Sequence, residues 1–295
     1  MSHSDQECVI TFDQCNQFRA LVDIVSNVLT TITFRVCPGE IQIDSIDSKS
    51  ICMVQARLQC SKTSGPSHTF CIGAGTLEKV LRGAPLHYSL DLRTNPDESP
   101  DVVMHSYETI TDSHEFKAVV PTLAETSEKV SLNDMEYEYV VETDLVMLRQ
   151  TVKNAIALGA EDIIFEIMYP DGHANKKQRV DGDGDESDSS GTRTSVFRIS
   201  SEGDAKISQT FVSTTQKNSN VIHTDMTNNV RLDASKLEPV FTASFCAEYL
   251  HKFFKSMERQ MVTMKMSPNM PLVVKYPLSQ GDSYIQFVLA AKVGD

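Results

Sequence analysis

A single pattern occurs twice along the 295 residues of this chain, and it restricts the possible folds more than any other feature. In each half, an amphipathic helix is followed by short strands, a second amphipathic helix and a further set of strands. Such helices and strands are stable only when they bury their apolar faces against one another. The repeat therefore predicts an α+β fold with two similar domains, each with two helices on antiparallel sheets.

Four helices are expected from apolar residues that recur at three- and four-residue spacing. Phe18, Leu21 and Val25 share one face of the first helix, and Gly159 is expected to end the third helix as a C-terminal cap. The helices are expected over residues 13–28, 76–84, 142–158 and 244–259.

Strands are expected where short runs rich in β-branched and aromatic residues are bounded by turn signals such as Pro38-Gly39. The runs in the first half are ITFRV, EIQIDSID, CMVQARLQC, HTFCI, HYSLDLR, DVVMHSY and EFKAVV. The runs in the second half are DIIFEI, SVFRI, AKISQTFV, MVTMKM, PLVVKY and YIQFVLA.

Two segments lack both periodicities. Residues 121–139 begin with proline and are polar at first, which predicts an extended connector between a domain over 1–120 and a domain over 140–295. Residues 171–194 are rich in Gly, Asp and Ser with almost nothing to bury, which predicts a disordered acidic loop. Within this loop, KKQR at 176–179 is either a weak nuclear localisation signal or an ordinary solvated segment.

The net charge of −13 does not exclude nucleic acid, because a basic helix face can coexist with acidic strands and loops. The absence of tryptophan and the aromatic content of 7% argue against a surface that stacks on single strands. Seven cysteines without a CxxC pair indicate reduced thiols and a reducing compartment. The N-terminus has no apolar run typical of a signal peptide or a membrane span, so a soluble intracellular protein is expected.

No motif supports an enzyme, a metal site or a cofactor. Asp181, Asp183 and Asp185 resemble the start of a calcium loop, but the glycine and glutamate that this loop requires are missing. Gly73 and Gly75 lack the third glycine of a dinucleotide fingerprint, and no GK[ST] or GxSxG motif occurs. An α+β enzyme with a small-molecule site is a third hypothesis, and it needs convergent titratable groups that the sequence does not offer.

Basic residues on the four helices are the remaining candidates. They form either ordinary solvated faces, since acidic residues such as Asp23, Glu78, Glu248 and Glu258 lie nearby, or a surface for nucleic-acid phosphate. The candidates are Arg19, Lys79, Arg82, Arg149, Lys153, Lys252, Lys255 and Arg259.

Several segments resemble the proliferating cell nuclear antigen family of sliding clamps. IDSIDSKSICMVQARL at 43–58 is similar to the N-terminal signature of this family, and EYLHKFF, SPNMPLVVKYPL and YIQFVLAAKV are similar to the C-terminal signature. AKISQT, TLEKVLRGA and ALGAEDIIF also match in order and spacing, so the resemblance covers nearly the whole chain.

The resemblance implies the DNA clamp fold and a trimeric ring whose helices line a channel. A homotrimer of this kind encircles double-stranded DNA, acts as a DNA polymerase processivity factor in the nucleus and tethers replication and DNA repair proteins. The partners implied are DNA polymerase, other proteins with short clamp-binding peptides, and a clamp loader, with no membrane. The helix cations would attract phosphate without reading bases, which permits sliding.

The resemblance also implies a pocket for a short helical peptide with aromatic anchors, and strands near residues 114–119 and 205–211 that join subunits. The family's histidine, aromatic and proline in the two signatures are replaced by Ser50, Val288 and Ala291, so a different peptide preference is expected. The pocket residues are Ile46, Met53, Val130, Leu132, Pro271, Val288, Leu289, Ala290 and Ala291.

Two alternatives keep the fold and change the assembly. The chain is then a subunit of a heterotrimeric checkpoint clamp or a monomeric viral-type processivity factor, and only a homotrimer closes a ring without other proteins.

Overall fold

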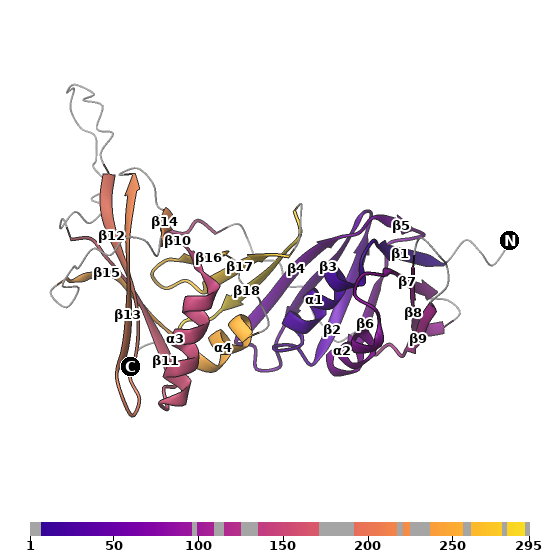
Figure 1. Cartoon of the computed structure of the whole chain (residues 1–295), viewed down its shortest axis with the longest axis horizontal. Coiled ribbons are helices and arrows are strands. Elements are labelled where there is room, and N and C mark those ends of the chain that lie inside the picture. Colours follow the sequence, from indigo (N-terminus) through magenta and orange to yellow (C-terminus); the bar gives the residue numbers. More distant parts are fainter. Residues whose placement is uncertain are drawn as a thin grey trace, which may run out of the picture. The chain divides into compact units, whose positions relative to one another are not determined.

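Two compact units make up the chain, as the computed structural model shows (Figure 1). Unit 1 comprises Met1–Asp134 and Lys275–Val288, and unit 2 comprises Met135–Val274 and Leu289–Asp295. The structure describes residues 7–95, 99–108, 115–124, 135–170, 192–216, 221–224, 237–255, 261–278 and 282–292.

The order of the described elements repeats along the chain. From β1 (Cys8–Phe12) to β9 (Glu115–Val120) the order is one strand, a helix, five strands, a helix and three strands. The elements from β10 (Tyr139–Asp144) to β18 (Tyr284–Leu289) follow the same order. The repeat expected from the sequence is therefore present in the topology, and it makes β4 equivalent to β13 and β9 equivalent to β18.

Unit 1 contains two sets of hydrogen-bonded strands. The first set has the order β5-β1-β7-β8-β9, with antiparallel pairing throughout. Within this unit the second set has the order β18-β4-β3-β2-β6. The further bounds are Thr31–Cys37 for β2, Glu40–Ile46 for β3, Cys52–Gln59 for β4, Lys62–Ser64 for β5, Thr69–Gly73 for β6, Ser89–Asn95 for β7 and Ser99–Tyr107 for β8.

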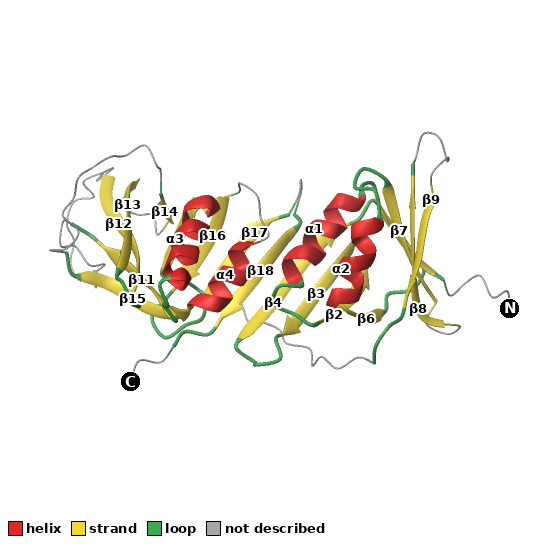
Figure 2. Ribbon diagram, turned by 60° about the horizontal axis from the view of Figure 1, so that its bottom comes forward, coloured by secondary structure: helices red, strands yellow, loops and turns green. Residues whose placement is uncertain are grey.

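Helices α1 (Cys15–Val25) and α2 (Ala74–Gly83) pack side by side on the strands of unit 1 (Figure 2). Phe18 of α1 stacks on Phe12 at 5.3 Å between ring centroids and lies 5.7 Å from Phe34, so the apolar stripe of the helix enters the core. Since Gln14 provides no side-chain cap, the N–H groups of Cys15 and Asn16 donate to loop carbonyls at 2.7 and 2.9 Å.

Unit 2 repeats this arrangement with strand orders β14-β10-β16-β17 and β13-β12-β11-β15. Its described pairs are antiparallel except for β10 with β14, which is parallel and corrects the expectation of purely antiparallel sheets. The further bounds are Asp162–Met168 for β11, Thr192–Ser201 for β12, Ile207–Gln216 for β13, Val221–His223 for β14, Pro239–Cys246 for β15, Met261–Met266 for β16 and Leu272–Pro277 for β17.

Helices α3 (Leu145–Ala157) and α4 (Ala247–Lys255) pack side by side in unit 2 (Figure 2). The Asp144 carboxylate accepts a hydrogen bond from the Val146 N–H at 2.6 Å and caps the start of α3. At its end, Gly159 has φ +75° and donates to Ile156, while the Ala160 N–H donates to the Ala155 carbonyl at 3.0 Å. This Schellman motif confirms the expected glycine cap.

Two helix starts expected from the sequence are wrong. Residues 142–144 belong to β10, because the Asp144 cap starts the helix only at Leu145. Residues 244–246 belong to β15, so Phe245 is buried from a strand and not from a helix. The first of these strands also shortens the expected connector, since Tyr139 already pairs with Met266.

Other expectations concern loops. Residues 192–194 begin β12, so the acidic loop expected over 171–194 ends earlier, and its other residues lie outside the described ranges together with connector residues 125–134. The domain ranges 1–120 and 140–295 remain a prediction.

Candidate nucleic-acid interface

Three cations lie on the outward side of the helix pair in unit 1. Arg19 of α1 pairs with Asp23 at 3.6 Å between Nε and Oδ2, and Arg82 of α2 pairs with Glu78. Both pairs span one helical turn. Lys79 is exposed and forms no ion pair with the described residues.

These charges form one group that spans both helices. Burial raises the pKa of the Asp23 carboxyl, the nearby Arg19 and Arg82 lower it, and Glu78 raises it further. The charge of Asp23 therefore interacts with charges on α2 as well as on its own helix. Asp23 and Glu78 together partly neutralise Arg19 and Arg82.

The helices of unit 2 carry four lysines and arginines and one carboxylate, a higher net charge than the helices of unit 1. Arg149 and Lys153 lie one turn apart on α3, whose opposite side is buried. On α4, Lys252 pairs with Glu248 at 2.7 Å, and its ammonium lies 5.0 Å from the centroid of the Tyr249 ring. Lys153 and Lys255 are exposed.

The four helices together carry seven lysines and arginines and three carboxylates, which leaves a net charge of +4 in a chain whose total is −13. The structure therefore places seven of the eight candidate cations on helices, and Arg259 lies outside the described residues. Exposed lysines and arginines on helix faces attract phosphate electrostatically and do not read base sequence.

The expected pocket residues differ in how accessible they are. Ile46 at the end of β3 is 41% exposed, and it lies opposite Met53, which is 6% exposed. Val288 and Leu289 of β18 are also buried, whereas Ala290 is exposed. Pro271 and Ala291 are partly exposed, and Val130 and Leu132 lie outside the described ranges.

Ile51 is an accessible apolar residue that the sequence-based list missed. It is 37% exposed at the other end of the turn that starts at Ile46. The Asp47 carboxylate fixes this turn by accepting hydrogen bonds from the N–H groups of Lys49, Ile51 and Cys52 at 2.7 to 3.1 Å. Ser50, the neighbour of Ile51, has φ +57° and helps to reverse the chain, and the sequence alone contained no signal for this exposure.

Metal binding and thiol reactivity can be examined from the described residues. They contain no group of three or more His, Cys, Asp or Glu side chains that could hold a metal ion. All seven cysteines are free thiols, and burial raises the pKa of Cys15 and Cys60 to about 11, which keeps both thiols protonated at neutral pH. No helix in the described ranges is long and apolar enough to span a membrane.

Neither protein-family models nor curated proteins match this sequence. Solved structures do. Proliferating Cellular Nuclear Antigen from Entamoeba histolytica matches with a TM-score of 0.72 and 14% identity, covering 97% of this chain and 99% of that chain. PCNA from Thermococcus kodakaraensis matches with a TM-score of 0.70 and 18% identity, covering 97% and 100%. The chain therefore has the PCNA fold, and the clamp fold expected from the sequence is confirmed.

Proposed function

We propose that this protein is a DNA sliding clamp, a homotrimer that encircles double-stranded DNA and acts as a polymerase processivity factor. One topological observation carries the proposal. In unit 1, β4 and β18 are neighbours in one sheet, and they come from the two different repeats of the chain. Their equivalents by element order, β13 and β9, each lie at the end of a sheet.

An end strand leaves a row of backbone N–H and C=O groups for another strand. If β13 of one copy pairs with β9 of the next, the junction between copies repeats the β4–β18 junction inside one copy. Because the two edges differ, the association is head to tail, and it closes into a ring when the rotation between copies permits. This agrees with the strands near 114–119 and 205–211 that the family resemblance implies as subunit junctions.

The proposed DNA contacts are the helix cations Arg19, Lys79, Arg82, Arg149, Lys153, Lys252 and Lys255, together with Arg259. Their charge supports loose attraction to phosphate in a chain with an acidic total. The proposal includes no catalytic residue and no cofactor.

The proposed partners are DNA polymerase, other replication and DNA repair proteins that carry short helical peptides with aromatic anchors, and a clamp loader, in the nucleus. The exposed Ile46 and Ile51 at the ends of a rigid turn support an apolar contact for such a peptide. The buried Met53 and Val288 would support this surface from beneath.

The mass of the native assembly tests the proposal. A homotrimer has three times the chain mass of 32.8 kDa, and it should persist when the protein is diluted to nanomolar concentration. A strictly monomeric protein would contradict the homotrimer and would favour the alternative of a monomeric viral-type processivity factor. A chain that forms trimers only with other subunits indicates the checkpoint-type clamp instead.

A further inference from the structure

The hairpin between β12 and β13 rests on the C-terminal end of α3 with almost no space between the backbones. A Cβ atom on Gly203 would lie 2.3 Å from the Leu158 carbonyl oxygen and 2.9 Å from the Ala160 nitrogen. Both neighbours are backbone atoms at the end of a helix, so they cannot rotate away as a flexible side chain would. Only glycine fits at this position without a backbone shift.

A hydrogen bond fixes the same contact. The Asp204 N–H donates to the Leu158 carbonyl at 2.8 Å, which satisfies a carbonyl at the end of the helix that has no partner within it. The hairpin tip therefore completes the cap of α3 while α3 holds the tip.

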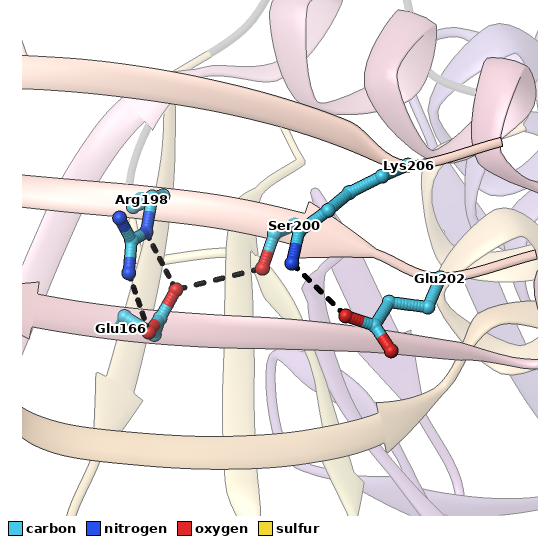
Figure 3. A network of polar contacts seen from close by, with 5 residues as sticks. All are labelled: Glu166, Arg198, Ser200, Glu202 and Lys206. Atoms are coloured by element: carbon cyan, nitrogen blue, oxygen red, sulfur yellow. Dashed lines mark hydrogen bonds and ion pairs between the residues drawn. The ribbon is translucent and has the colours of Figure 1, made fainter. Parts of the chain in front are cut away.

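The rest of the hairpin is held from within unit 2, as Figure 3 shows. The Arg198 guanidinium of β12 donates two hydrogen bonds to the Glu166 carboxylate of β11 at 2.6 and 2.7 Å, a bidentate pair of limited exposure. Lys206 and Glu202 form an ion pair at 3.0 Å across the hairpin loop. Strand β13 pairs with β12 on one side and ends its sheet on the other.

Unit 1 has a related contact at its own end strand. A Cβ atom on Gly83, the last residue of α2, would lie 3.2 Å from Cε2 of Phe116 on β9. Here the neighbouring atom belongs to a partly exposed side chain that can move, so the requirement for glycine at position 83 is weaker than at position 203. In both units, the edge strand or the loop that leads into it therefore packs against the C-terminal end of a helix that carries candidate DNA-binding cations.

We infer that Gly203 is a positioning residue for assembly, because it lets α3 hold β13 in the orientation that a second copy of this chain needs for pairing through β9. This inference rests on the proposed homotrimer. A strand that is ordered before association loses less conformational freedom on binding, so its fixed position strengthens the interface without contributing a contact.

The test is Gly203→Ala, with dissociation of the trimer measured by sedimentation or mass photometry over a dilution series. We expect the concentration at which the trimer dissociates to rise about tenfold or more, while circular dichroism of the variant stays that of a folded chain. The matched control is Gly75→Ala in α2, where an added Cβ meets nothing within 4 Å and assembly should be unchanged.

The outcomes separate this inference from the proposed function. A wild-type chain that does not assemble contradicts the homotrimer itself. A wild-type trimer that Gly203→Ala leaves equally stable to dilution overturns the positioning role alone. If Gly203→Ala does not fold, hydrogen exchange of the wild type decides: in diluted monomers, the Asp204 amide should be protected, and free exchange there contradicts a hairpin fixed before association.

Discussion

The two helix pairs have similar positions in the repeat but different electrostatics. Helices α1 and α2 carry three cations and two carboxylates, a net charge of +1, whereas α3 and α4 carry four cations and one carboxylate, a net charge of +3. Exposed ion pairs of this kind contribute little to stability. Within each pair, however, the carboxylate reduces the attraction that the lysine or arginine exerts on a third charge such as a phosphate. If the helices contact DNA as proposed, those of unit 2 should contribute more of the attraction, which the total charge of −13 does not indicate.

Charge reversal on the helices of unit 2 should weaken DNA binding the most. Arg149→Glu combined with Lys153→Glu should lower affinity for duplex DNA by about 10-fold to 100-fold and reduce the slope of log K against log salt by about 2, with the trimer intact. Fluorescence anisotropy over a salt series measures both quantities.

The control for this pair is Arg57→Glu with Lys62→Glu, which changes net charge equally at two exposed positions outside the helices. Equal losses for the two double variants would mean that net charge and not helix position governs binding.

The matching reversal in unit 1 should have a smaller effect. Arg19→Glu with Arg82→Glu removes cations that Asp23 and Glu78 already compensate, so we expect a loss of about 3-fold to 10-fold in the same salt series. A loss as large as that of the unit 2 variant would show that the ion pairs do not shield these arginines.

Removing the carboxylates of unit 1 should increase binding. Asp23→Asn with Glu78→Gln releases both arginines and should raise DNA affinity by about 2-fold to 5-fold at moderate salt. Glu248→Gln in unit 2 provides a comparison in which one cation is released. If the unit 1 double variant binds DNA no better than the wild type, the difference in net charge between the two helix pairs has no effect on DNA affinity.

The smallest effect is a pH dependence. Burial raises the pKa of Asp23, so in the folded protein this group takes up a proton at a higher pH than an ordinary aspartate does. As the pH falls toward that pKa, unit 1 loses a negative charge and DNA affinity should rise. The contribution of Asp23 is the difference between the pH profiles of DNA affinity for the wild type and for Asp23→Asn, and we expect it to be about twofold or less. Identical pH profiles for the two proteins would show that Asp23 makes no contribution.

Protonation of Asp23 changes stability in the same direction as it changes DNA affinity. A carboxyl whose pKa is raised on folding adds stability as the pH falls through its folded pKa, and that contribution is lost as the pH rises through the same value. The ionised Asp23 is therefore less favourable in the folded chain than an exposed aspartate, and Asp23→Asn should not lower the melting temperature at pH 7.

The sequence predicted features that follow from local periodicity. All four helices were placed, and the buried stripe of Phe18, Leu21 and Val25 was correct because helical spacing reports the buried face directly. Among the strands, β1, β5, β10, β14 and β15 were missed. β10 and β15 run directly into helices through Asp144 and Cys246 without a turn signal, so each appeared to be the first turn of a helix.

Other features depend on contacts between distant residues and carry no local signal. The Arg19 and Asp23 pair could be expected from one-turn spacing, but the influence of Glu78 and Arg82 on Asp23 depends on how α1 packs against α2. The requirement for glycine at position 203 depends on the end of α3, more than forty residues earlier in the chain. Ile51 was missed because exposure depends on the turn that Asp47 fixes.

Retention on circular DNA tests the closed ring most directly. A clamp assembled around a circular duplex, by a loader or by reversible ring opening, should stay bound after a wash at high salt, because a closed ring is held by topology, and it should leave within minutes once a restriction enzyme linearises the DNA. Release that depends on salt alone and is the same for circular and linear DNA would contradict a closed ring around the duplex.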